Sequence, residues 1–117
     1  MQRAYSLKKN KQFQYVYRRG KHTGCRELSL LVVRGSRLLV GFSVGKKVGN
    51  SVTRNLLKRR MREIVRPLLP VMKPAQYVVV IRESARDADF STLKSGLHGL
   101  LRRHNALMDG AYRPLKT

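Results

Sequence analysis

Acidic side chains are the scarcest feature of this sequence. Six Asp and Glu stand against 26 Lys and Arg, which gives a formal net charge of +20 over 117 residues. A chain this basic repels itself, so we expect it to be marginally stable until a polyanion neutralises part of the charge. The acids are also scattered singly, without the clustered carboxylates by which protein nucleases and phosphatases hold metal ions. The composition therefore favours a protein that binds a polyanion over a self-sufficient hydrolase.

Cysteine, long apolar runs and a signal-peptide core are also missing. Cys25 is the only cysteine, so no intrachain disulfide can form, and a reducing cytoplasm fits. No segment approaches the ~18 consecutive apolar residues of a membrane span. Residues 1–11 carry charge but no apolar stretch, so we expect no signal peptide. His22, His98 and His104 lack zinc-ligand spacing with Cys25, and we expect no protein-bound metal and no membrane partner.

Length and patterning indicate one folded domain. At 117 residues the chain can build a single modest core, and its 42% hydrophobic residues fall in periodic blocks, which excludes general disorder. We expect a single domain over residues 1–117, with residues 1–9 and 108–117 flexible.

The periodicity predicts seven elements. A helix capped by Asn10 has its apolar residues at i, i+3, i+4 spacing and ends near Gly20. A short strand at 21–25 and apolar runs at 28–33 and 38–44 follow, and the two runs are expected to pair as an antiparallel hairpin. The basic helix comes next, and prolines at 67, 70 and 74 are expected to end it in a stiff loop.

The last two elements follow the prolines. Residues 77–81 are nearly all β-branched, which predicts a strand buried on both faces. Asp87 or Asp89 is expected to cap a final helix with His98 and His104 on its outer face. The inward residues expected for that helix are Phe90, Leu93, Leu97, Leu100 and Leu101. The order α-β-β-β-α-β-α predicts an α+β fold, a two-layer sandwich of helices on a small sheet.

Residues 45–66 form the strongest motif. The segment GKKVGNSVTRNLLKRRMREIVR carries eight Lys or Arg and a single acid, Glu63. At about 100° per residue its apolar side chains, Leu57, Met61, Ile64 and Val65, share one face. The other face carries cations and an asparagine: Asn55, Lys58, Arg59, Arg62 and Arg66. Such a helix docks on a core with one side and offers phosphate-binding groups on the other.

This motif resembles the signature of the bacterial ribonuclease P protein subunit. Residues 43–50 (SVGKKVGN) and 54–63 (RNLLKRRMRE) match the family's strand end, Lys-Lys pair, Gly-Asn and Arg-Asn-x-x-Lys-Arg-x-x-Arg helix in the same order. The segment leading to Phe13, Val16 and Tyr17 is similar to the family's N-terminal part. About a hundred residues are covered.

The resemblance implies a fold, and it implies separate roles for the protein and RNA subunits. The family fold is of the ribosomal protein S5 domain 2-like type, with a left-handed βαβ crossover. The enzyme removes the 5′ leader from precursor tRNA. Its RNA subunit performs the Mg²⁺-dependent hydrolysis, and the protein subunit binds the leader and helps to hold the complex together. The expected partners are therefore the catalytic RNA subunit and precursor tRNA, without DNA and with no catalytic residue in the protein.

The resemblance also implies a set of site residues. Phe13 and Tyr17 correspond to aromatics that line a leader-binding cleft between the first helix and the sheet. The alternative for both is that the rings simply hold the helix on the sheet. The residues expected to bind RNA from the basic helix and its preceding loop are Lys46, Lys47, Arg54, Asn55, Lys58, Arg59, Arg62 and Arg66.

Three other functions are compatible with composition alone. A ribosomal or other structural RNA-binding protein would have similar size and charge. An architectural DNA binder would too, although no helix-turn-helix pair is evident. A self-sufficient nuclease would have to act without RNA.

Overall fold

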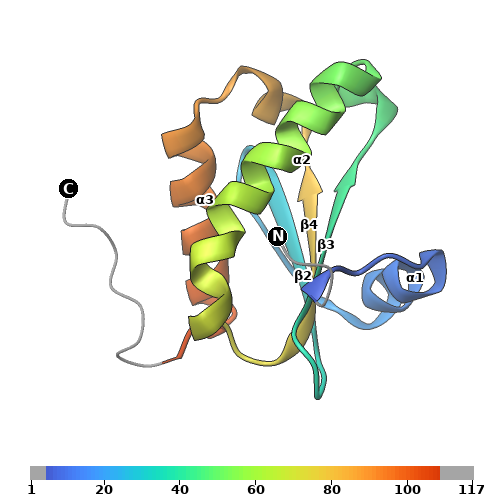
Figure 1. Ribbon diagram of the computed structural model, residues 1–117, viewed down its shortest axis with the longest axis vertical. Coiled ribbons are helices and arrows are strands. Elements are labelled where there is room, and N and C mark those ends of the chain that lie inside the picture. The colour runs from blue at the N-terminus through green and yellow to red at the C-terminus, as the bar shows by residue number, and fades with distance from the viewer. Residues whose placement is uncertain (1–4, 109–117) are drawn as a thin grey trace.

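The computed structural model describes residues 5–108. A four-stranded sheet carries helices α2 (Ser51–Val65) and α3 (Phe90–Arg103) on one face and helix α1 (Asn10–Arg19) on the other (Figure 1). The strands are β1 (Lys21–Gly24), β2 (Leu28–Arg34), β3 (Leu39–Val44) and β4 (Ala75–Ile81). The 3₁₀ helices that connect them are η2 (Lys46–Val48), η3 (Arg66–Val71) and η4 (Glu83–Asp87). The predicted α+β fold and its order of elements are confirmed.

The sheet separates two apolar cores because alternate residues of a strand face opposite sides. In β4, Tyr77, Val79 and Ile81 join the large core under α2 and α3. Val78 joins a small core under α1. Val16 is the only buried residue that α1 contributes to this core. The prediction of a strand buried on both faces is therefore confirmed, and β4 is central in the sheet.

The predicted hairpin of residues 28–33 with 38–44 is wrong. The strand order is β1-β2-β4-β3, so β4 lies between those two segments. It pairs antiparallel with β2, where Leu30 is opposite Val79, and parallel with β3, where Phe42 is opposite Val79. A strand that is apolar on both faces gains most from a central position, and this long-range pairing outweighs the short turn between β2 and β3. The hairpin is formed instead by β1 and β2.

The connection from β3 through α2 to β4 has the handedness that the resemblance implies. In Figure 1 α2 crosses in front of the sheet, β3 and β4 both point upward, and β4 lies to the left of β3. Because the two strands are adjacent and parallel, this path is a left-handed crossover. Such connections are rare exceptions among βαβ units.

Several local expectations need correction. Lys9, with the side chain of Gln12, caps α1 in place of Asn10. Most of the proline segment is the 3₁₀ helix η3 rather than a loop. Pro67 lies in the first turn of η3, where its missing N–H is not needed for hydrogen bonding within the helix, and Pro74 follows the end of η3. Phe90 is 44% exposed, since it directly follows the cap residue Asp89 at the open end of α3. His98 is buried, one residue beyond the inward Leu97.

The chain ends are tied to the fold where they are described. Residues 1–4 and 109–117 of the segments predicted to be flexible lie outside the described residues. Leu7 is buried, and its N–H donates to the carbonyl of Val40 at 2.9 Å. The N–H of Met108 donates to the carbonyl of Val71 at 2.8 Å.

Candidate nucleic-acid interface

Helix α2 is fixed at its start by a cap and along its length by a buried face. The side chain of Asn50 accepts a hydrogen bond from the N–H of Thr53 at 2.9 Å, which satisfies one of the free N–H groups of the first turn. The four apolar residues predicted to face inward, Leu57, Met61, Ile64 and Val65, are all buried. The opposite face of α2 is therefore exposed to solvent and available to a partner.

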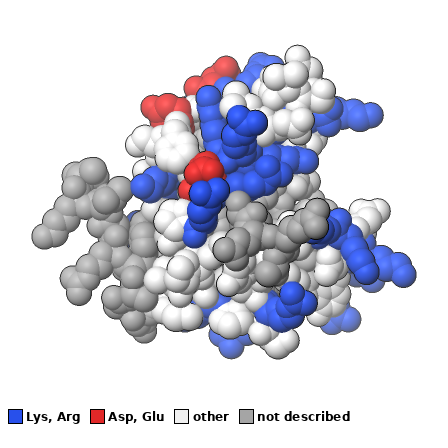
Figure 2. Space-filling model, viewed as in Figure 1, with Lys and Arg blue, Asp and Glu red and all other residues white. Residues whose placement is uncertain are grey.

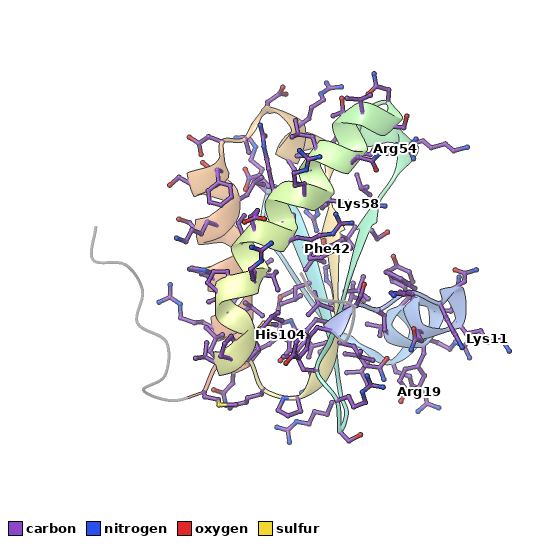
Figure 3. All side chains as sticks on the ribbon, viewed as in Figure 1. Lys11, Arg19, Phe42, Arg54, Lys58 and His104 are labelled. Carbon is purple, nitrogen blue, oxygen red and sulfur yellow. The ribbon has the colours of Figure 1, made fainter. Side chains whose placement is uncertain are left out.

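The predicted cations of α2 lie on that outer face. Asn55, Arg59 and Arg62 are exposed, whereas Arg54 and Lys58 are half-buried. Figure 3 shows Arg54 and Lys58 on the flank of α2 that is nearer to β3. Figure 2 shows blue side chains along the length of the helix.

Nearly all of this charge is unneutralised within the described part of the chain. In the described part of the chain the only salt bridge joins Arg66 to Glu63, with 3.2 Å between nitrogen and oxygen. The charge of Arg66 is therefore partly neutralised by Glu63, whereas the remaining α2 cations have no acidic partner among residues 5–108. A row of unpaired cations on a rigid helix is suited to the phosphates of a nucleic acid.

The two predicted aromatic residues project from α1 on one flank. The ring centroids of Phe13 and Tyr17 are 6.5 Å apart with a tilt of 39°. Phe13 lies directly on the sheet at Gly41, where an added Cβ would be 2.6 Å from the ring. Tyr17 remains 41% exposed. Phe13 thus has a packing role and is half-buried, whereas Tyr17 is exposed to solvent.

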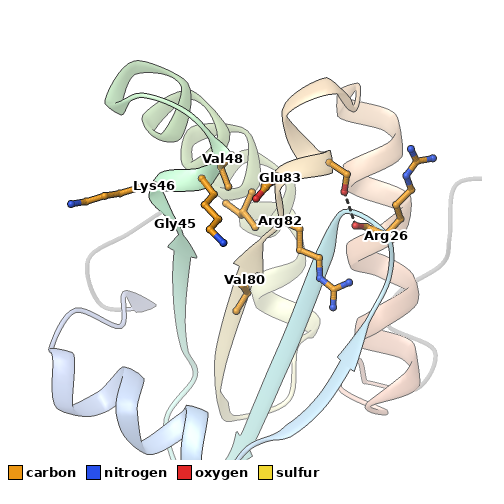
Figure 4. A pocket seen from close by; sticks show the side chains of 10 residues that line it. Arg26, Gly45, Lys46, Val48, Val80, Arg82 and Glu83 are labelled. Carbon is orange, nitrogen blue, oxygen red and sulfur yellow. Dashed lines mark hydrogen bonds between the residues drawn. The ribbon is translucent and has the colours of Figure 1, made fainter.

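A shallow hollow lies at the end of the sheet where β3 and β4 finish. It encloses about 700 Å³ and includes Val80, whose side chain belongs to the α1 side of the sheet. Figure 4 shows it above α1, between the loop after β3 and the segment after β4. Its lining residues are Arg26, Gly45, Lys46, Lys47, Val48, Val80, Ile81, Arg82, Glu83 and Ser84. Four cations and one carboxylate make it a net positive site.

Arg82 is the most firmly held cation of the hollow. Its Nε and Nη2 donate to Ser29 Oγ at 2.9 Å and 2.5 Å. The guanidinium also lies beside Gly24, where an added Cβ would be 2.7 Å from Nη2. Ser29 and Gly24 therefore fix the group on the sheet surface. Figure 4 shows Arg82 extended over the sheet and Lys46 pointing away from the loop.

Sequence reasoning located the loop lysines but missed Arg26 and Arg82. Arg82 is the first residue after the apolar run 77–81, so its position at a strand end was a usable signal. Its partner Ser29 lies 53 residues away and becomes a neighbour only through the β2–β4 pairing. Arg26 lies in the turn between β1 and β2, and its side chain carried no pattern that distinguished it from other surface arginines.

The described residues offer little for metal-dependent chemistry. Among residues 5–108 no three His, Cys, Asp or Glu side chains gather where they could hold a metal ion. His104 Nε2 is 2.8 Å from Thr23 Oγ1, and this contact ties the end of α3 to β1. No helix in this part of the chain is long and apolar enough to cross a membrane.

These features define a small basic RNA-binding protein of the α+β class, with charged and aromatic surfaces on the two faces of one sheet. The family model described as Ribonuclease P matches residues 1–105. The chain therefore belongs to the ribonuclease P protein family.

Individual relatives agree with this assignment. The ribonuclease P protein component of Streptococcus equi subsp. zooepidemicus is 33% identical over 112 residues, which cover 94% of each chain. The corresponding protein of Streptococcus pyogenes is 35% identical over the same coverage.

Solved structures are similar too. The RNase P protein of Staphylococcus aureus has a TM-score of 0.84 at 28% identity, covering 90% of this chain and 99% of that one. The RNase P protein of Thermotoga maritima has a TM-score of 0.77 at 28% identity, covering 84% and 96%.

Family membership selects among the functions that composition left open. It makes the chain an RNA-binding component of a tRNA-processing ribonucleoprotein, part of an endoribonuclease, rather than a ribosomal protein or a DNA-binding protein. The resemblance drawn from residues 43–63 is confirmed.

Proposed function

We propose that this protein binds the catalytic RNA subunit of ribonuclease P through α2 and the 5′ leader of precursor tRNA through the surface between α1 and the sheet. The RNA subunit, with Mg²⁺, carries out the hydrolysis, and the complex acts in the cytoplasm. The observation that carries the proposal is that Phe13, with Tyr17 beside it, packs on the same side of the sheet as Val80, which lines the basic hollow.

The leader site combines flat rings with a fixed cation. A single strand of variable sequence needs surfaces that accept any base, and stacking on an aromatic ring contributes about 1–3 kcal/mol per base. Tyr17, which is 41% exposed, and the half-buried Phe13 supply such surfaces. Arg82, held by Ser29, supplies a guanidinium that loses little entropy when it binds a phosphate.

The RNA-subunit site is the outer face of α2 and the loop before it. Its residues are Lys46, Lys47, Arg54, Asn55, Lys58, Arg59, Arg62 and Arg66. Within this set, Arg59 and Arg62 are exposed and have no acidic partner in the described chain, whereas Arg66 is shared with Glu63. We therefore assign the largest contributions to Arg59 and Arg62. Lys46 and Lys47 also line the hollow and can contact either RNA.

The assignment of hydrolysis to the RNA rests on the chemistry of the side chains. Phosphodiester hydrolysis by a protein with two metal ions needs several converging carboxylates. Among residues 5–108 no three acids, histidines or cysteines converge where they could hold a metal ion. Asp89 is occupied in capping α3, where it accepts from the N–H of Thr92 at 2.7 Å.

The proposal is tested by reconstitution. Purified protein, RNA-subunit transcript and Mg²⁺ are combined with a 5′-labelled precursor tRNA, and each component is omitted in turn. We expect cleavage at the mature 5′ end only when the RNA subunit is present, with the protein raising the rate at physiological salt. Cleavage at that position by RNA-free protein would contradict the assignment of the chemistry. Failure of the protein to bind or stimulate the RNA subunit would contradict the proposal as a whole.

A further inference from the structure

The outer surface of α1 is strongly basic and has no role in the leader site. Every charged residue before Glu27 is a lysine or an arginine. The helix buries only Val16, and its Phe13–Tyr17 flank turns toward the cleft. Four exposed residues of the remaining surface, Lys11, Tyr15, Arg18 and Arg19, are here called the outer face of α1.

The geometry of the helix brings these four side chains together. Lys11, Tyr15 and Arg19 are spaced at four residues, so they follow one another along one flank. Arg18 is opposite the buried Val16 and extends the same surface. All four are exposed, and Tyr15 keeps 44% of its surface accessible. Figure 3 shows Lys11 and Arg19 extending from α1 away from the sheet.

Among residues 5–108 no acid lies in α1 or next to it in the chain. The described acids are Glu27 in the β1–β2 turn, Glu63 in α2, and Glu83, Asp87 and Asp89 at η4 and the start of α3. None of the four outer-face residues forms a salt bridge within the described chain. Figure 2 likewise shows red side chains over the α2–α3 side of this view and blue ones over α1. The outer face is therefore complementary to an anionic surface.

We propose that the outer face of α1 is a second docking surface for the RNA subunit, separate from α2 and from the leader cleft. This inference rests on the proposed function, because it takes the RNA subunit as partner. A single ring among three cations suits the backbone of a folded RNA with one accessible base, whereas a long single strand needs a series of rings.

Two separated contacts would hold the protein in a fixed orientation. The outer face of α1 and the cations of α2 lie on opposite faces of one sheet, in a molecule measuring 39 × 38 × 25 Å. RNA that reaches both sides encloses the leader cleft between them. The protein then aligns the leader with the RNA active site rather than merely adding charge.

The chain offers a matched pair of variants for the test. Arg18 and Arg19 are the basic residues in the last turn of α1, and Arg102 and Arg103 are those in the last turn of α3. All four are exposed. Replacing either pair with Gln removes two charges and the same favourable interaction with a helix C-terminus. In α3 it also removes the hydrogen bond that Arg103 Nη1 donates to the carbonyl of Gly24 at 3.5 Å. Any difference between R18Q/R19Q and R102Q/R103Q therefore reports a local contact.

The measurement is the affinity for RNA-subunit transcript, without tRNA, over a series of salt concentrations. Loss of two phosphate contacts should lower the log–log salt slope by about 1.4–1.8 for R18Q/R19Q and leave it nearly unchanged for R102Q/R103Q. Y15A should weaken the same complex several-fold without changing the slope. Circular dichroism melting establishes that each variant is folded.

The outcomes separate the two hypotheses. Equal salt slopes for the two arginine pairs would overturn the second docking surface, while wild-type binding to the RNA subunit would still support the proposed function. A loss confined to precursor or mature tRNA would also overturn it, because the surface would then belong to the substrate. Absence of any wild-type binding to the RNA subunit would contradict the proposed function itself.

Discussion

One substitution can separate the packing role of Phe13 from the leader-stacking role proposed for it. Its ring packs on Gly41, so Phe13→Ala would remove both core contact and stacking surface. Phe13→Leu keeps an apolar side chain over Gly41 but removes the flat ring. We expect F13L to keep most of its thermal stability and to lose on the order of 1–3 kcal/mol of binding to precursor tRNA, with mature tRNA little affected. The ratio of the two affinities in the reconstituted enzyme is the measurement.

Tyr15 provides the control for this prediction. It is a tyrosine of the same helix with exposure similar to that of Tyr17, 44% against 41%, but it projects from the other flank. Y17A should lower the precursor-to-mature ratio and Y15A should not. An equal effect of F13L on both tRNAs, or a large fall in melting temperature, would assign Phe13 to the core alone.

The pH dependence of stability should be dominated by His98 in mildly acidic solution. Burial, together with the nearby Lys94 and Arg102, lowers the pKa of His98 from 6.5 to about 4. As pH falls below 6.5 the unfolded chain takes up a proton that the folded chain accepts only near pH 4, so the free energy of unfolding decreases across that interval. The pKa of His104 is lowered as well, chiefly by burial, and adds to the same trend.

The corresponding measurement is the melting temperature from pH 7 to pH 4.5 for H98Q and H22Q. We expect a shallower decline in H98Q, because glutamine takes up no proton, and a decline like that of the wild type in H22Q, because His22 is exposed. The slopes are compared rather than the absolute values, since H98Q also changes packing. Parallel curves for H98Q and the wild type would contradict this account.

At the scale of the element, the strongest prediction concerns the outer face of α2. R59Q/R62Q removes two exposed cations from its outer face without touching the buried side. Loss of two phosphate contacts should weaken binding to the RNA subunit and reduce the log–log salt slope by about 1.4–1.8. R59K/R62K should restore little wherever the guanidinium makes two parallel hydrogen bonds to one phosphate. Affinity and slope equal to those of the wild type would show that α2 is not the docking face.

Elements whose evidence is local were predictable from sequence. The buried face of α2 and the β-branched strand β4 each follow from periodicity or residue type within a few positions. The position of β4 between β2 and β3 was not predictable from sequence, because it depends on contacts between distant segments. The same limit applies to the site: the basic motif was evident, whereas the Ser29–Arg82 contact exists only once β2 and β4 are neighbours.

At the scale of the whole molecule, charge opposes folding. The chain carries a formal net charge of +20, and the described part contains the single salt bridge between Arg66 and Glu63. Like charges on both faces of a thin sheet structure repel one another, and screening shortens the range of that repulsion from about 30 Å at 0.01 M salt to about 8 Å at 0.15 M. The free protein should therefore be more stable at higher ionic strength.

This prediction is checked by thermal melting of the free protein in NaCl from 0.01 M to 0.3 M. We expect the melting temperature to rise steeply at first and then level off, as the screening length falls below the spacing of the charges. A polyanion such as polyphosphate should give the same gain at a far lower concentration, because it binds the folded surfaces in addition to screening them. Sucrose at the same osmolality is the control, since it strengthens burial without screening charge. If sucrose raises the melting temperature as much as NaCl, or if NaCl lowers it, self-repulsion is not what limits the stability of this fold.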